Sequence, residues 1–77
     1  MPDIGIACED LAEVRRLAAT GAARRIREEA RLSLAEVADD VGTALVNISR
    51  WELGTRRPRG PEALRWLRLL RRLERAA

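Results

Sequence analysis

The chain of 77 residues has 15 basic residues, 12 acidic residues and a formal net charge of +3. It contains no histidine and a single cysteine, Cys8, so it lacks the usual metal-ligand clusters, the usual acid-base residue at neutral pH and any internal disulfide. A domain this small has a modest core and little room for an enclosed active site. We therefore expect a single domain over residues 1–77, with no enzyme activity, no metal and no cofactor.

The first residues, MPDIGIACEDL, show no basic region followed by an apolar run, which a secretory leader would have. No stretch approaches the roughly 18 uninterrupted apolar residues of a membrane span. Together with the single cysteine, these features favour a cytoplasmic protein with no membrane partner.

The two signs of charge are segregated along the chain. Residues 1–42 contain nine acids and six arginines, a net charge of −3, whereas residues 43–77 contain nine arginines and three acids, a net charge of +6. A bias in the coding sequence explains the use of arginine instead of lysine, but it does not explain the segregation. The pattern indicates that one end of the protein faces a polyanion, most often nucleic acid.

Every periodic segment has the helical repeat, so we expect an all-α fold, a compact bundle of about five helices. Thr20 and Gly21 separate the first two helices, because glycine is unfavourable inside a helix. The second helix is predicted over AARRIREEA, residues 22–30. The first is predicted at about 9–19, where one apolar stripe comprises Leu11, Val14, Leu17 and Ala18.

The signals that begin and end helices are clearest after Leu32. Ser33 and Glu36 form an S-x-x-E capping box, flanked by Leu32 and Val37 at the two positions of a hydrophobic staple. The short helix that follows ends at Gly42, because glycine adopts positive φ without steric cost.

Thr43 is positioned to cap the next helix, ALVNISRWEL, which ends at Gly54. A long last helix is predicted at about 61–75, with Pro61 at its first position, where the missing N–H has no helical partner. The two short helices and the turn between them make a helix-turn-helix pattern over about 33–53. Ala38 allows the two helices to approach closely, and their shared core is expected to contain Val37, Val41, Ile48 and Trp51.

A helical wheel of the second short helix separates an inner face, with Ala44, Ile48 and Trp51, from an outer face. Leu45 and Val46 suit contact with thymine methyl groups in the major groove, unless another helix covers them. Arg50 is able to bond guanine O6 and N7, or else it binds a phosphate. The outward-pointing residues are Val46, Ser49, Arg50 and Leu53, with Leu45 and Asn47 on the flanks.

The stretch LSLAEVADDVGTALVNISRWELGTRRP resembles the Cro and phage-repressor type of helix-turn-helix family, whose members typically read LSxxxLAxxxGxxxxxISRWExGxxxP. The resemblance extends over residues 22 to about 60. It implies the fold of the lambda-repressor-like DNA-binding domains and a transcriptional repressor of a prokaryotic or phage-infected cell. Where many members have a glutamine that braces a phosphate, this chain has Leu34. The positions that read bases in the family correspond to Ala44, Leu45, Val46, Ser49 and Arg50.

The resemblance also implies a structural pair between Arg27 and Glu52, because the matching glutamate of the family meets an arginine of a preceding helix. An acid in a DNA-binding helix would otherwise be repelled by phosphate. In the family the loop after this helix passes along the DNA backbone, where its arginines would neutralise phosphates instead of forming a merely solvated loop. The residues expected to contact phosphates are Asn47, Arg56, Arg57 and Arg59.

The last helix carries a wide apolar arc, which predicts a homodimer on a two-fold operator, packing against the helix at about 9–19, or both. Trp51 and Trp66 are expected in the core, since no Phe or Tyr is present to fill it. Two alternative functions use the same fold: an antitoxin-type module that binds a protein partner, and an excisionase-like architectural DNA binder. No small-molecule ligand is expected. The arc comprises Ala63, Leu64, Trp66, Leu67, Leu69, Leu70 and Leu73.

Overall fold

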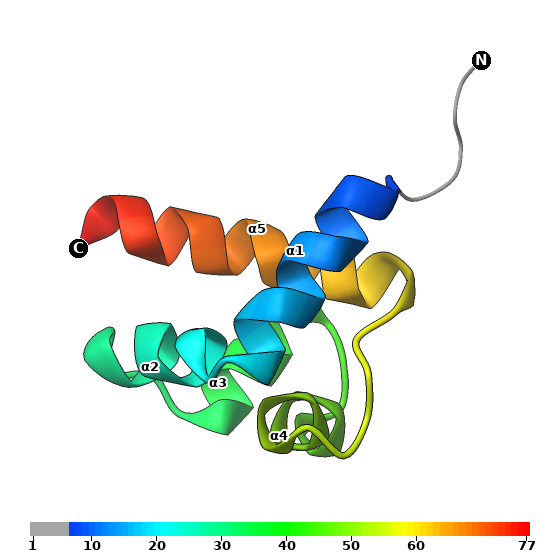
Figure 1. Ribbon diagram of the computed structural model, residues 1–77. Coiled ribbons are helices and arrows are strands. Elements are labelled where there is room, and N and C mark those ends of the chain that lie inside the picture. Colours follow the sequence, from blue (N-terminus) through cyan, green and yellow to red (C-terminus); the bar gives the residue numbers. More distant parts are fainter. Residues whose placement is uncertain (1–6) are drawn as a thin grey trace.

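The structure is a computed structural model that describes residues 7–77. The first six residues of MPDIGIACEDL, the segment that argued against a secretory leader, therefore lie outside the described residues. The described residues form five helices and no strand, which confirms the expected all-α bundle (Figure 1). The helices are α1 (Cys8–Ala19), α2 (Ala22–Glu29), α3 (Leu34–Val41), α4 (Leu45–Leu53) and α5 (Gly60–Ala76).

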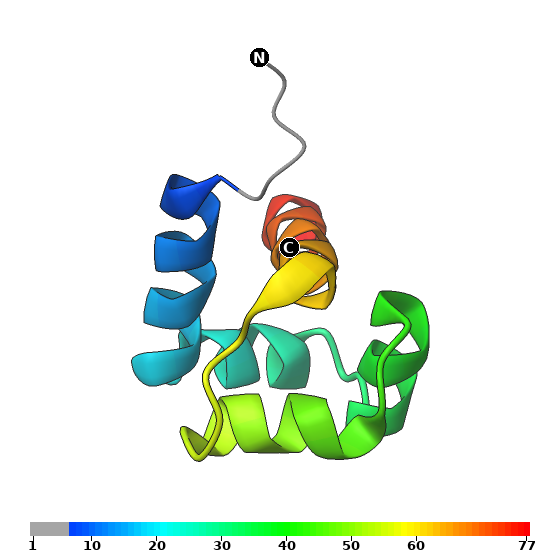
Figure 2. The same ribbon diagram turned by 90° about the vertical axis from the view of Figure 1, so that its right-hand side faces the viewer.

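Helices α4 and α5 lie at opposite ends of the bundle. In both views α5 is at the top and α4 at the bottom (Figures 1 and 2). Helices α1, α2 and α3 each pack against α5, and α3 packs against α4 to form the helix-turn-helix. This arrangement leaves one long side of α4 without a covering helix among the described residues, as Figure 2 shows at its lower edge.

The apolar arc of α5 is covered within the chain. Ala63, Trp66, Leu67, Leu69 and Leu70 are buried, and Leu64 and Leu73 are partly buried. The helices that cover them are α1, α2 and α3. Packing inside the chain, rather than a dimer interface, therefore accounts for the width of this arc.

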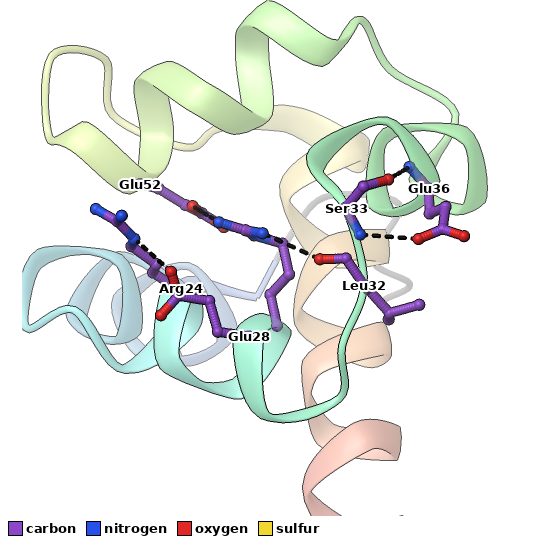
Figure 3. Close-up of polar contacts among 7 residues, drawn as sticks. Arg24, Glu28, Leu32, Ser33, Glu36 and Glu52 are labelled. Atoms are coloured by element: carbon purple, nitrogen blue, oxygen red, sulfur yellow. Dashed lines mark hydrogen bonds and ion pairs between the residues drawn. The ribbon is translucent and has the colours of Figure 1, made fainter.

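The turn into α3 has the expected capping box. The Glu36 backbone N–H donates to Ser33 Oγ at 3.0 Å, and the Ser33 N–H donates to Glu36 Oε1 at 2.8 Å (Figure 3). At the other end of α3, Gly42 has φ of 81°, a conformation that L residues with a side chain rarely adopt. Leu34, which stands where the resemblance implied a glutamine, is partly buried against the core. It packs instead of presenting a polar group.

The start of α4 differs from the prediction. Ala44, not Thr43, occupies the N-cap position, and no side chain caps this helix. The Thr43 hydroxyl instead accepts a hydrogen bond of 2.8 Å from Asn47 Nδ2. Ala44 is exposed, so its assignment to the inner face was wrong; as the N-cap it has extended backbone angles and precedes the first helical turn.

The start of α5 also shifts by one residue. The helix begins at Gly60, which has φ of 76°, and Pro61 follows it in the first turn. Because the first four N–H groups of a helix have no partner within it, proline is accommodated at this position as well.

Candidate nucleic-acid interface

The uncovered side of α4 is apolar as well as basic. Leu45 is 46% exposed, Val46 44% and Leu53 65%, and these are the large apolar side chains that the described residues leave exposed. On the opposite side of the same helix, Ile48 and Trp51 are buried. No other helix of the described residues covers Leu45 and Val46. Packing within the chain therefore does not explain why these two positions are apolar.

The predicted base-contacting residues lie together at the N-cap and on the outer side of α4. Arg50 and Ala44 are exposed with Leu45 and Val46, while Ser49 is partly exposed. Apolar groups beside a guanidinium offer both methyl contact and paired N–H donors, the two kinds of contact that distinguish bases in the major groove.

Asn47 lies at intermediate exposure beside the turn. Its hydrogen bond to Thr43 fixes the amide group next to the first turn of α4. The side chain is thus held at the edge of the exposed surface, on the flank where it was expected.

Helix α4 is attached to α2 by an ion pair. Arg27 Nε donates to Glu52 Oε2 at 2.7 Å, and Arg27 Nη2 donates to Glu52 Oε1 at 2.9 Å. Arg27 Nη1 donates to the Leu32 carbonyl at 3.0 Å; Figure 3 shows the dashed contacts at Glu52 and at Leu32. The side chains are 13% and 5% exposed, and the two parallel hydrogen bonds satisfy the carboxylate on both oxygens.

The ion pair keeps Arg27 charged. Hydrogen bonding to Glu52, together with the negative charge of that carboxylate, raises the pKa of Arg27 above its ordinary value, although burial opposes the shift. The acidic group of α4 is therefore neutralised from inside the protein, and it does not oppose a phosphate on the outer side.

The arginines of the loop after α4 are exposed. Arg56, Arg57 and Arg59 all point into solvent, whereas Pro58 between them is buried. Arg15 of α1 donates from Nε to the Pro58 carbonyl at 2.9 Å. The loop is thus fixed at its centre while its charged side chains remain available.

Sequence reasoning missed two positioning arginines, Arg15 and Arg65. Arg65 Nε donates to the Val41 carbonyl at 2.6 Å and so satisfies a carbonyl at the end of α3. Both contacts join residues far apart in the chain, 43 and 24 positions respectively, and neither is part of a local motif. The sequence offers at most a weak signal for them: the carbonyls that they bind lie at predicted helix ends and loops, where carbonyls have no helical partner.

Other kinds of site have little support in residues 7–77. No group of three or more metal-ligating side chains comes together within that range. No helix in that range is both long enough and apolar enough to span a membrane.

Comparison with known families gives one match. A family model described as helix-turn-helix matches residues 24–74, a span that begins within α2 and ends near the end of α5. Comparison with curated proteins and with solved structures gave no match.

Proposed function

The chain belongs to the Cro and phage-repressor type of helix-turn-helix family, whose members are DNA-binding transcription regulators, and we propose that it is a sequence-specific repressor that binds a two-fold operator in double-stranded DNA. The observation that carries this proposal is the outer side of α4. Leucine, valine and arginine side chains are exposed there, on a helix whose opposite side is anchored in the core.

In this proposal the outer side of α4 enters the major groove. Leu45 and Val46 contact thymine methyl groups, and Arg50 makes paired hydrogen bonds to guanine. Ala44 and Ser49 complete the contacts to base edges. These five residues would supply the sequence preference of the protein.

The surrounding polar residues would hold the helix in register. Arg56, Arg57 and Arg59 bind phosphates from the loop, and Asn47 binds a phosphate at the start of α4. These contacts raise affinity for every DNA sequence and carry no information about bases. The buried position of Pro58 and its hydrogen bond from Arg15 support this role, because they fix the loop after α4 against α1.

We expect two copies on the operator, because a two-fold DNA site matches a two-fold dimer. The apolar arc of α5 is covered by the chain itself, so the dimer contact must use another surface. Half-sites should then lie about 10 base pairs apart, centre to centre.

Selection from a pool of random duplexes tests the proposal. Repeated binding and recovery should enrich a two-fold sequence, and footprinting of that sequence should protect the predicted half-sites. A pool that stays random after selection would contradict sequence-specific binding. An excisionase-like role would instead appear as strong bending of the selected duplex, with little change in transcription from it.

The structure removes the main observation in favour of the antitoxin-type alternative. It relied on an apolar last helix that remained available to a protein partner, and most of those side chains are buried. No other observation on the described residues favours that function over DNA binding.

A further inference from the structure

A second basic surface lies on α5, away from α4. An open groove of about 520 Å³ is lined by arginines of α5 and by Asp40 of α3. We call this surface the α5 arginine groove. Its arginines are Arg65, Arg68, Arg71, Arg72 and Arg75.

Two arginines of the groove, Arg68 and Arg75, face the opposite way from the outer side of α4. Trp66 marks the inner side of α5, because its ring lies 5.0 Å from that of Trp51 in α4. Successive residues of a helix are rotated by about 100°. Arg68 and Arg75 therefore lie about 200° and 180° around α5 from Trp66. Figure 1 shows the same separation, with α5 at the top of the molecule and α4 at the bottom.

Some of these arginines already have partners within the chain. Arg71 contacts Asp10 and Glu13, and Arg72 Nη2 lies 3.1 Å from Asp40 Oδ2. With these three acids counted against the five arginines, the surface keeps a net charge of +2.

Within residues 7–77, Arg65, Arg68 and Arg75 have no acidic partner, but Arg65 donates to the Val41 carbonyl, so Arg68 and Arg75 are the least engaged of the five. Both are exposed, and among the described residues no acidic group forms an ion pair with either of them. They are therefore the two side chains of the groove with the most donor capacity left for a ligand.

The lining of the groove favours phosphate over a protein partner. Every lining side chain is charged, whereas the centre of a protein interface is usually depleted of charge and contains aromatic or aliphatic anchors. Phosphate binding needs only cationic donors, and the planar guanidinium suits it well.

The spacing of the arginines fits a nucleic-acid backbone. Arg65, Arg68, Arg72 and Arg75 recur at intervals of three and four residues, so they follow one side of α5 over about 15 Å. One strand of a DNA duplex has a phosphate about every 3.4 Å along the axis, which gives about four phosphates over that distance.

We propose that the α5 arginine groove binds the phosphate backbone of a second DNA duplex, so that one molecule joins two duplex segments. This inference rests on the proposed function for the first segment, which is bound by α4. The second contact reaches only phosphates and is independent of sequence. When both segments belong to one DNA molecule, the second encounter is intramolecular and is favoured by a high effective concentration.

A capture assay tests the inference with the full chain. One duplex is immobilised, the protein is added, and retention of a second, fluorescent duplex of the same arbitrary sequence is measured. The groove variant is Arg68→Gln with Arg75→Gln. The matched control is Arg16→Gln with Arg25→Gln, which removes the same charge from exposed positions of α1 and α2 outside both surfaces.

The groove variant should retain the second duplex about tenfold less well than the control does, and the log-log salt slope of retention should fall by about 2, since each lost phosphate contact contributes about 0.9. Its thermal unfolding midpoint should match that of the control, because Arg68 and Arg75 are exposed. A dimer could also hold two duplexes through its two α4 helices, so retention by the wild type alone does not support the inference. The supporting result is lower retention by the groove variant than by the control variant. Equal retention by both variants would overturn the inference.

Two further measurements separate this inference from the proposed function. A variant with Arg50→Ala, Arg56→Gln and Arg57→Gln should lose affinity for a single duplex; unchanged affinity would overturn the proposed function, and the groove inference falls with it. If that variant loses affinity while the groove variant retains the second duplex normally, only the groove inference fails. A glutamate-rich peptide that binds the wild type but not the groove variant, without any difference in duplex retention, would assign the groove to an acidic protein and overturn the inference.

Discussion

The indole rings of Trp51 and Trp66 lie with their centroids 5.0 Å apart and their planes inclined by 34°, which joins α4 to α5 inside the core. Both side chains are almost fully buried. Trp51 follows Arg50 directly in the sequence, so the same short segment of α4 is anchored in the core and carries the principal candidate for base contact. The geometry of the candidate interface therefore depends on the packing of the core.

Replacing Trp51 with alanine should destabilise the domain severely. Truncation of a buried tryptophan costs about 3 to 5 kcal/mol, which is a large part of the stability of a domain of this size. Urea denaturation would measure the difference in the free energy of unfolding. Leu53→Ala is the control, because that side chain is exposed and its loss should change the free energy by less than about 0.5 kcal/mol. Similar effects of the two changes would contradict the described core.

Replacing Glu52 with glutamine should cost about 3 kcal/mol, because it leaves the guanidinium of Arg27 without its counter-charge in a largely buried position. The bond from Arg27 to the Leu32 carbonyl remains and places the effect at the lower end of the usual range. Denaturation of Arg24→Gln provides the comparison. Arg24 pairs with Glu28 on the surface, where such pairs contribute at most about 1 kcal/mol. If both variants unfold at the same denaturant concentration, the inner pair has no special structural role.

The raised pKa of Arg27 determines how its contribution to the free energy of unfolding changes with pH. A group whose folded-state pKa is raised contributes stability that is fully present below its unfolded pKa and is lost as the pH rises through the folded pKa. For Arg27 this loss falls in the strongly alkaline range. The ionisation of Arg27 should therefore not alter the stability difference between wild type and Glu52→Gln near neutral pH, as denaturation at several pH values would reveal.

Replacing Arg50 with alanine should weaken binding to the selected operator by about 1 to 3 kcal/mol, while binding to unrelated duplexes changes little. The reason is that paired hydrogen bonds to guanine are lost only where guanine is present. Fluorescence anisotropy with both kinds of duplex would measure the two affinities. An equal loss on every sequence would show that Arg50 contacts phosphate instead.

Replacing Arg56 and Arg57 together with glutamine should weaken binding to every sequence. If Arg56, Arg57 and Arg59 of each protomer each neutralise one phosphate, a dimer makes about six such contacts and the log-log salt slope is near −5; the double replacement should bring it to about −2. Titrations at a series of salt concentrations give the slope, and Arg16→Gln with Arg25→Gln controls for net charge. A slope equal to that of the control would mean that the loop does not reach DNA.

The parts of the fold with local chemical signals could be predicted from the sequence. Ser33 and Glu36 lie three residues apart and form the capping box that this spacing indicates. Gly42 ends α3 in the left-handed region, as a glycine after a helical pattern suggests. Thr43 shows the limit of such signals, because its hydroxyl binds Asn47 instead of capping the helix. A side chain with two possible partners is not assigned by spacing alone.

Contacts between distant segments have no local signal, and the pair of Arg27 and Glu52 was expected through the family resemblance alone. The apolar arc of α5 indicated that something covers it, but the arc does not encode whether the cover is α1 or a second molecule. Arg15 and Arg65 look like ordinary surface arginines in the sequence, yet each donates to a backbone carbonyl of another segment. Such bonds depend on the completed tertiary arrangement, which brings together residues with no local relationship.

The hydrogen bond between Arg15 and the Pro58 carbonyl has an entropic consequence. Fixing the backbone of a free loop residue costs about 1 to 2 kcal/mol of conformational entropy, and a mobile loop would lose that freedom when it meets its ligand. Here the centre of the loop is already ordered in the free protein, so binding requires mainly the ordering of the arginine side chains. Helix α1 lies entirely outside the matched family region, yet through Arg15 it preorganises a segment inside that region.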